Sequence, residues 1–256
     1  MPKIDRMIDK TDKFTIQKDN IFNLPMRLLI IGNTGMGKSS ILGNLLLKKE
    51  FYRGDWKPEN IFIFSGSLKG DAKLNIIKKE LDIPEGNLFD EYNNEIGHMI
   101  YDELVDDYNE AINNNTKPNH SLIIFDDLGF TNLQKGKKNN DIMDKILCNG
   151  RKFLISTITL NQKLTQLSTN AREQCSGCIL GKSTNKQLDL VADDFNYLNG
   201  KKNKQRFLDM VKTNTKGKHN FIVFNFSNGN NIYQNERFEN ICTCEGESIC
   251  GGIKQN

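Results

Sequence analysis

The segment "GNTGMGKS", residues 32–39, constrains the fold of this chain more than any other stretch. It matches the pattern G-x-x-x-x-G-K-[ST], in which glycines let backbone N–H groups converge on phosphate oxygens. The apolar run Leu28–Ile31 precedes it, and apolar residues follow at helical spacing at Ile41, Leu42 and Leu45. The motif therefore lies between a predicted strand and a predicted helix, which is the context a phosphate-binding loop requires.

This motif predicts specific roles for its residues. Lys38 is expected to reach the β- and γ-phosphates of a nucleotide and to act in catalysis, and the Ser39 hydroxyl is expected to bind Mg²⁺. ATP and Mg²⁺ are the expected cofactors, although nucleotide binding without hydrolysis stays open. The predicted nucleotide-binding residues are Gly32, Asn33, Thr34, Gly35, Met36, Gly37, Lys38, Ser39 and Ser40.

Further short apolar runs alternate with helical patterns along the chain. This alternation predicts an α/β fold, with a mostly parallel sheet and helices on both faces. Ligands of such sheets bind at the carboxyl ends of the strands. The additional predicted strands are Asn60–Phe64, Leu122–Phe125, Phe153–Ile158, Cys178–Leu180 and, at an edge, Phe221–Phe226; the clearest helices are Glu95–Asn113 and Asp141–Leu147.

Composition excludes two classes of protein. The 256 residues include 35 basic and 32 acidic side chains, and the net charge of +3 is too small to coat nucleic acid through bulk charge. A local basic loop remains compatible with it. No apolar stretch approaches the roughly 20 residues of a membrane span, and Met1–Asn20 does not resemble a signal peptide. A soluble intracellular protein is expected.

The stretch "LIIFDDLGF", residues 122–130, has two interpretations. In the first, Asp126 binds Mg²⁺ at the end of a strand and Asp127 polarises an attacking water. In the second, the segment from Asp126 to Gly129 is the D-x-x-G switch with which a GTPase senses the γ-phosphate. A GTPase also needs the guanine motif N-K-x-D, but the asparagine–lysine pair at 185–186 has its aspartate one residue late, at Asp189.

Other polar residues are candidates for catalysis. Gln162 follows the fourth predicted strand and is expected to sense the γ-phosphate, with Asn161 and Thr159 as alternates. Arg151 and Arg172 flank that strand, and either one delivered from a neighbouring subunit would stabilise the transferring phosphoryl group. We favour Arg151, and an ordinary surface arginine is the alternative for both.

Two further groups of residues invite a functional interpretation. A short cationic loop follows the paired aspartates and contains Lys135, Lys137 and Lys138. It is expected either to contact DNA phosphates or to be an ordinary solvated loop. The six cysteines include C-x-x-C and C-x-C pairs, but their spacing fits no common zinc module. Structural or incidental thiols are therefore the preferred interpretation, with zinc or a disulfide as alternatives.

Taken together, the phosphate loop, "LIIFDD", "GRKFLIS" and the strand ending near Gln162 resemble the DNA-packaging ATPases of large eukaryotic DNA viruses and virophages, in the FtsK–HerA superfamily. The resemblance covers roughly Leu24–Lys182. It departs from the family at Lys152, where members often have histidine, and this leaves the role of Arg151 open. The resemblance implies a RecA-like P-loop NTPase fold with an additional strand between the Walker A and Walker B strands.

The same resemblance implies a function. Subunits would form a ring, a pentamer or hexamer, that hydrolyses ATP at its interfaces and drives double-stranded DNA into a capsid through a portal vertex. The expected location is the host cytoplasm, at the viral factory, or the virion. Alternatives are a GTPase-like nucleotide switch and an ATPase that loads a helicase or transposase.

The expected organisation has two parts. Residues 1–212 form the ATPase domain, with a lead-in at residues 1–23, and residues 213–256 form an edge strand and a cysteine-containing tail. An extra strand between the strands at Leu28 and Leu122 would favour the motor class, whereas direct adjacency would favour a GTPase.

Overall fold

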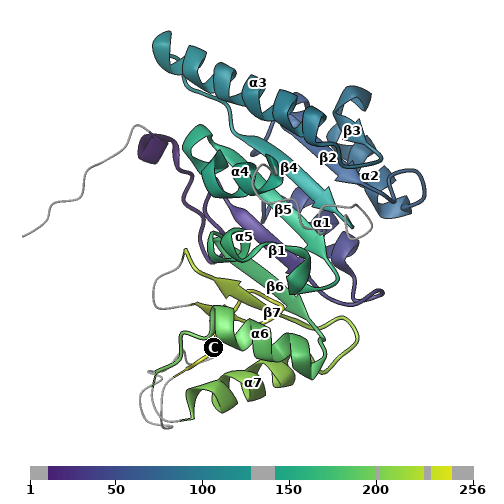
Figure 1. Cartoon of the computed structure of the whole chain (residues 1–256), viewed down its shortest axis with the longest axis vertical. Coiled ribbons are helices and arrows are strands. Elements are labelled where there is room, and N and C mark those ends of the chain that lie inside the picture. Colours follow the sequence, from purple (N-terminus) through teal and green to yellow (C-terminus); the bar gives the residue numbers. More distant parts are fainter. Residues whose placement is uncertain (1–10, 128–141, 200–201, 228–231, 244–256) are drawn as a thin grey trace, which may run out of the picture.

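A computed structural model describes residues 11–127, 142–199, 202–227 and 232–243. Its centre is one eight-stranded sheet with the order β3-β2-β4-β5-β1-β6-β7-β8 (Figure 1). The first six of these strands in space pair in parallel, and the last two join antiparallel. The strands are β1 (Arg27–Ile31), β2 (Ile61–Ser65), β3 (Leu88–Phe89), β4 (Ser121–Asp126), β5 (Ile155–Asn161), β6 (Gly177–Gly181), β7 (Phe221–Asn225) and β8 (Tyr233–Gln234).

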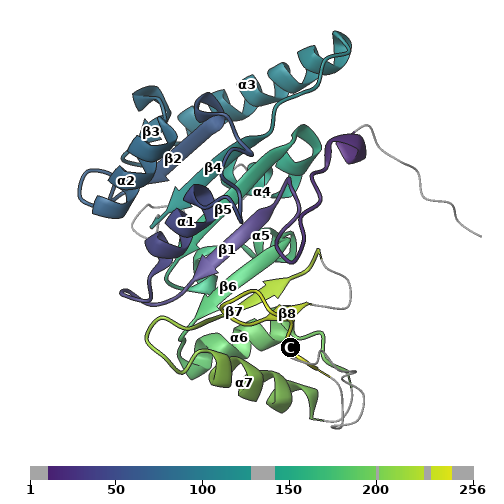
Figure 2. The ribbon, with the colours of Figure 1, turned by 180° about the vertical axis from the view of Figure 1, so that it is seen from behind.

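Helices cover both faces of this sheet, as the alternation of elements predicts. One face carries α1 (Lys38–Leu47) and α2 (Ala72–Leu81), which lie in front of the sheet in Figure 2. The other face, seen in Figure 1, carries α3 (Asn94–Asn113), α4 (Ile142–Asn149), α5 (Thr169–Glu173), α6 (Asn185–Phe195) and α7 (Asn203–Asn214).

Two hydrophobic cores follow from the alternation of side chains along the central strands. In β1, Leu28 and Ile30 pack with α1 and α2, whereas Leu29 and Ile31 pack with the helices of the opposite face. The central strands are apolar on both faces because both are covered, which is typical of buried parallel sheets.

The strand β5 lies between β1 and β4 and is parallel to both. The prediction of an additional strand between the Walker A and Walker B strands is therefore confirmed. The register pairs Ile31 with Asn161 and Asp126 with Leu160. All three strands consequently end at the same edge of the sheet, next to the phosphate loop.

Some predicted boundaries need correction. The fourth strand begins at Ile155 rather than Phe153, because residues 150–153 form a 3-10 turn that ends at Leu154 with a left-handed φ of 59°. The strand at Phe221 is not at the edge of the sheet, because β8 pairs with its outer side. The proposed domain division stays a prediction, and residue 213 lies inside α7.

The lead-in to the first strand is part of the core. Phe22 and Leu24 are fully buried, and the Tyr52 hydroxyl donates a 2.8 Å hydrogen bond to the carbonyl of Phe22. The Phe22 ring lies directly over the backbone of Gly177 at the start of β6, where a Cβ atom would collide with it. A glycine is therefore required at this position by close packing.

The described cysteines follow both interpretations, since three of them are free thiols and Cys242 forms a disulfide. The free thiols are Cys148, Cys175 and Cys178, and burial raises the pKa of Cys175 to about 12. Within the described ranges, no group of three or more histidine, cysteine or acidic residues is arranged to hold a metal ion. None of the helices in this part of the chain has the length and apolar character of a membrane-spanning helix.

Replacing Gly177 with alanine is expected to destabilise the fold by about 1–3 kcal/mol, because the added methyl group must displace the buried Phe22 ring. Gly86→Ala is the matched control, since a Cβ atom there meets nothing within 4 Å. Urea unfolding of both variants measures the difference. Equal stabilities would mean that the contact between Phe22 and Gly177 is not tight.

Candidate active site

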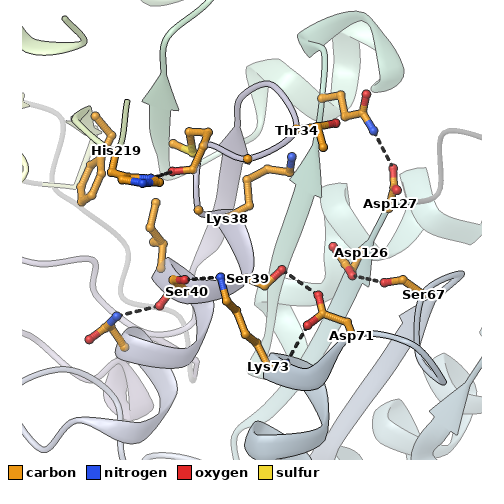
Figure 3. A pocket seen from close by; sticks show the side chains of 17 residues that line it. Thr34, Lys38, Ser39, Ser40, Ser67, Asp71, Lys73, Asp126, Asp127 and His219 are labelled. Carbon is orange, nitrogen blue, oxygen red and sulfur yellow. Dashed lines mark hydrogen bonds between the residues drawn. The ribbon is translucent and has the colours of Figure 1, made fainter. Parts of the chain in front are cut away.

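A cavity of about 700 Å³ opens at the carboxyl edge of the sheet (Figure 3). The phosphate loop and α1 form one wall, the ends of β4 and β5 form another, and residues after β2 and at the start of β7 complete it. Its lining residues are Thr34, Gly35, Met36, Gly37, Lys38, Ser39, Ser40, Ile41, Asn44, Ser67, Asp71, Lys73, Asp126, Asp127, Gln162, His219 and Phe221.

The phosphate loop has the backbone that its glycines predict. Gly35 and Gly37 have φ angles of 81° and 104°, a region that glycine occupies without a steric penalty. Gly37 is the N-cap of α1, and no side chain caps this helix. The N–H groups of the first turn of α1 therefore remain available for an anion, which the positive end of the helix dipole also favours.

The side chain of Met36 anchors the loop to the sheet. It is 4% exposed and lies against Gly32 and against Gly181, the last residue of the neighbouring strand β6. A Cβ atom at either glycine would collide with the Met36 side chain. Of the nine predicted nucleotide-binding residues, residues 34–40 line the cavity, whereas Gly32 and Asn33 do not. Gly32 and Asn33 belong to the turn that orients residues 34–40 toward the cavity.

Lys38 is held inside the loop, where its Nζ donates a 2.8 Å hydrogen bond to the carbonyl of Gly32. Burial lowers the pKa of Lys38, and the nearby charges of Asp127 and Asp126 partly oppose this shift. A phosphate group in the cavity would add negative charge beside the ammonium and stabilise its protonated form.

Asp126 ends β4 and is 5% exposed. Its Oδ2 accepts hydrogen bonds from the hydroxyls of Ser65, at 2.8 Å, and Ser67, at 3.4 Å. Burial raises the pKa of Asp126; the Ser65 bond opposes the shift, and the charges of Asp127 and Asp71 add to it. A cation bound beside this carboxylate would therefore favour its ionised form.

Asp127 is turned toward a different part of the cavity than Asp126. Its φ of 48° is left-handed, and its N–H donates to the carbonyl of Leu160 at 3.2 Å. The carboxylate Oδ1 accepts a 3.4 Å hydrogen bond from Nε2 of Gln162 (Figure 3). The left-handed backbone at the end of the strand thus brings the second carboxylate to the residue predicted to sense the γ-phosphate.

The alternates for that sensor lie elsewhere. Thr159 and Asn161 are buried within β5, and neither lines the cavity. Asn161 instead contributes its backbone carbonyl, which accepts a 3.1 Å hydrogen bond from the N–H of Gly32. Among the three candidates, Gln162 alone lies in the wall of the cavity.

Sequence reasoning missed the contribution of the segment after β2. Asp71 caps α2 through Oδ1, which accepts from the Lys73 N–H at 2.7 Å, while its Oδ2 accepts from the Ser39 hydroxyl at 3.0 Å. The Lys73 ammonium donates to the Ser40 hydroxyl at 2.6 Å. The signal was present, because "SGSLKGD" follows a predicted strand whose carboxyl end belongs at the ligand edge of the sheet.

The donor set of the cavity suits Mg²⁺. The Ser39 hydroxyl and the Asp126 carboxylate supply oxygen ligands, and the Asp71 carboxylate lies within hydrogen-bonding distance of Ser39. Mg²⁺ prefers oxygen ligands and commonly uses one or two carboxylates together with nucleotide phosphates. The residues present therefore fit the metal that the phosphate loop implies.

The two candidate arginines do not line the cavity. Arg151 is exposed at the amino edge of the sheet, where its guanidinium lies 3.9 Å from Asp12. Arg172 is buried, with Nε donating to Asp194 at 2.8 Å and Nη1 donating to the carbonyl of Leu167 at 3.1 Å. The candidate DNA-binding residues Lys135, Lys137 and Lys138 lie outside the described residues.

The candidate guanine motif is part of a helix. Its asparagine and lysine, residues 185–186, begin α6 after the N-cap Thr184. Asp189 lies 3.9 Å from the ammonium of Lys204 on α7. Neither the asparagine nor Asp189 lines the nucleotide cavity, so the structure gives this motif no place in base recognition.

Solved structures share this fold. The DNA-packaging ATPase B204 from Sulfolobus turreted icosahedral virus matches with a TM-score of 0.55 and 14% identity, over 83% of this chain and 97% of that one. The genome-packaging NTPase B204 from Sulfolobus turreted icosahedral virus 2, in complex with AMP, matches with a TM-score of 0.55 and 14% identity, over 82% and 96%.

A cellular secretion protein has the fold as well. The cytoplasmic domain of the type VII secretion ATPase EccC from Thermomonospora curvata matches with a TM-score of 0.51 and 10% identity, over 82% of this chain and 24% of that one. These identities are low, so the likenesses concern the fold alone. No match to this chain is found among curated proteins.

Family membership rests on the sequence itself. Residues 13–245 match the family described as Poxvirus A32 protein, and this range contains the phosphate loop, the paired aspartates, Gln162 and the strands on both sides of them. The match extends through β7 and β8, well past the segment Leu24–Lys182 on which the motif resemblance was based. The chain belongs to the Poxvirus A32 protein family.

Proposed function

We propose that this protein is an ATP-driven translocase that packages double-stranded viral DNA into a capsid. The observation that carries the proposal is the position of β5 between β1 and β4. It puts Gln162 beside Asp127, in the same cavity as Lys38 and the uncapped start of α1. A carboxylate and an amide thus face a phosphate-binding loop, as hydrolysis of a phosphoanhydride requires.

Each group has a definite task in this reaction. Asp127 accepts the proton of the attacking water, and the Gln162 amide orients that water toward the γ-phosphate. Lys38 and the amides of α1 stabilise negative charge on the phosphates. Ser39 and Asp126 would hold Mg²⁺, whose positive charge would neutralise the phosphate oxygens.

The packaging role draws support from three sources. The chain belongs to the Poxvirus A32 family, and its fold resembles a protein described as a DNA-packaging ATPase. The basic segment with Lys135, Lys137 and Lys138 follows Asp127 after residues 128–134. If this segment contacts DNA phosphates, hydrolysis at Asp127 is coupled to DNA through only a few residues of backbone.

The position of Arg151 supports catalysis between subunits. It is exposed at the amino edge of the sheet, whereas the nucleotide cavity is at the carboxyl edge of the same subunit. Its guanidinium would therefore act on the nucleotide of a neighbour in a ring of five or six subunits. Arg172 is less suitable, because Asp194 and Leu167 already occupy its guanidinium.

The alternatives receive less support from the geometry. A GTPase-like switch is disfavoured because the candidate guanine motif does not line the cavity, and because β5 separates β1 from β4. An ATPase that loads a helicase or transposase would share this site and differ only in its partner. The packaging ring would act at a capsid or portal vertex in the host cytoplasm, at the viral factory, or on the virion.

Asp127→Asn is expected to retain ATP binding and to lose about 10²- to 10⁴-fold in turnover, because an amide cannot accept the proton from water. Asparagine tolerates the left-handed backbone at this position. ATP binding and DNA-stimulated hydrolysis are measured separately. Asp82→Asn is the matched control, since Asp82 also has a left-handed φ, of 52°, but is exposed at the end of α2. Normal turnover by Asp127→Asn would sink the catalytic assignment.

Lys38→Ala and Arg151→Ala are each expected to be inactive alone. For Arg151→Ala, the ATPase rate should fall by about 10³- to 10⁵-fold, as for other trans-acting arginines. A mixture should recover activity, because in mixed rings about one interface in four joins an intact Lys38 to an intact Arg151. ATPase rates of the mixture and of each variant test this. A mixture as inactive as its components would rule out Arg151 as a group acting between subunits.

A further inference from the structure

The nucleotide cavity has a second end that phosphate chemistry does not explain. Figure 3 shows Asp127 and His219 on opposite sides, with Lys38 between them. Asp127 marks the γ-phosphate end, so the nucleoside must extend toward His219. The lining also includes Ile41 and Asn44 of α1 and Phe221, which is two residues from His219 in the chain.

The topology of the sheet explains how residues so late in the chain reach the loop. The strand β7 is antiparallel to β6 and pairs Phe221 with Gly181, so β7 begins where β6 ends. Gly181 is also the residue against which Met36 packs. The start of β7 is thereby brought to the phosphate loop, and Nδ1 of His219 lies 3.3 Å from the carbonyl oxygen of Met36.

This contact determines which ring nitrogen of His219 carries the proton. A carbonyl oxygen only accepts hydrogen bonds, so Nδ1 of His219 is the donor to Met36. In the neutral imidazole, Nε2 is then left as an acceptor. Adenine presents an amino group as a donor at its 6-position, whereas guanine presents an oxygen acceptor there. At the 6-position, an Nε2 acceptor matches the amino group of adenine and is mismatched with the oxygen of guanine.

Phe221 supplies the apolar part of the same end. Phe221 lines the cavity, is half-buried, and packs edge-on against Phe238, so only the part of its ring toward the cavity can contact a planar base. Stacking on such a ring is insensitive to the identity of the base, since every base has a π-face. Affinity and selectivity would therefore come from two different side chains.

We propose that His219 and Phe221 bind the nucleobase, with His219 selecting adenine over guanine through Nε2. This inference rests on the proposed function, because it assigns a specificity residue to the same ATP site. It gives a task to the segment before β7, which the sequence motifs left without one.

The test compares binding of ATP, GTP and inorganic triphosphate by wild-type protein and by His219→Ala. We expect the variant to bind ATP about 10-fold more weakly, to bind GTP about as well as wild-type protein does, and to bind triphosphate unchanged. Triphosphate reports on the phosphate loop alone, which separates base recognition from a structural effect of the bond to Met36. His98→Ala is the control, since His98 lies on α3 outside the cavity.

Phe221→Ala provides a second arm. It is expected to weaken ATP and GTP equally, by about 10-fold, and to leave triphosphate binding unchanged. Equal losses of ATP, GTP and triphosphate in His219→Ala would overturn the inference, as would a wild-type protein that does not distinguish ATP from GTP. If either result is found while DNA-stimulated ATPase activity is intact, the base-binding inference fails and the proposed function stands. A wild-type protein that binds no ATP refutes both the inference and the proposed function.

Discussion

The pairing of β5 with both of its neighbours is the constraint on which the site depends. The carbonyls of Leu160 and Asn161, adjacent on β5, accept the N–H groups of Asp127 and Gly32 at 3.2 and 3.1 Å. The acid pair and the start of the phosphate loop are thus attached to consecutive residues of one strand. A slip of one residue in β5 would move Gln162 away from Asp127 and reverse the faces of every buried side chain in the strand.

The burial of charged side chains makes the cavity built on this strand suited to charged ligands. Burial lowers the pKa of Lys38 and raises the pKa of Asp126, so both groups are disfavoured in their charged forms. The hydroxyl of Ser39 bonds to Asp71, and Lys38 bonds to its own loop. Phosphates and Mg²⁺ supply the opposite charges that these groups lack, which makes nucleotide and metal binding mutually favourable.

Much of the fold and the central part of the site could be predicted from the sequence, because their signals are local. The phosphate loop, the aspartate pair and Gln162 each follow an apolar strand directly, and parallel strands bring such positions to one edge. The contributions of His219 and Phe221 were missed, since both reach the cavity through pairing between distant segments. Asp71 was missed although its segment directly follows a predicted strand. Phe221 in particular depends on β7 being antiparallel, for which alternating strands and helices give no indication.

By itself, the sequence determined the class of fold and the chemistry of the phosphate end, because glycine spacing, apolar runs and the order of acidic residues are properties of short segments. Only the tertiary structure decided the order of the strands outside β1, β5 and β4, the separation of Arg151 from the cavity of its own subunit, and the opposite end of the cavity at His219. These depend on which strands pair and in which direction, and long-range pairing of this kind is set by packing of the whole core rather than by any local pattern.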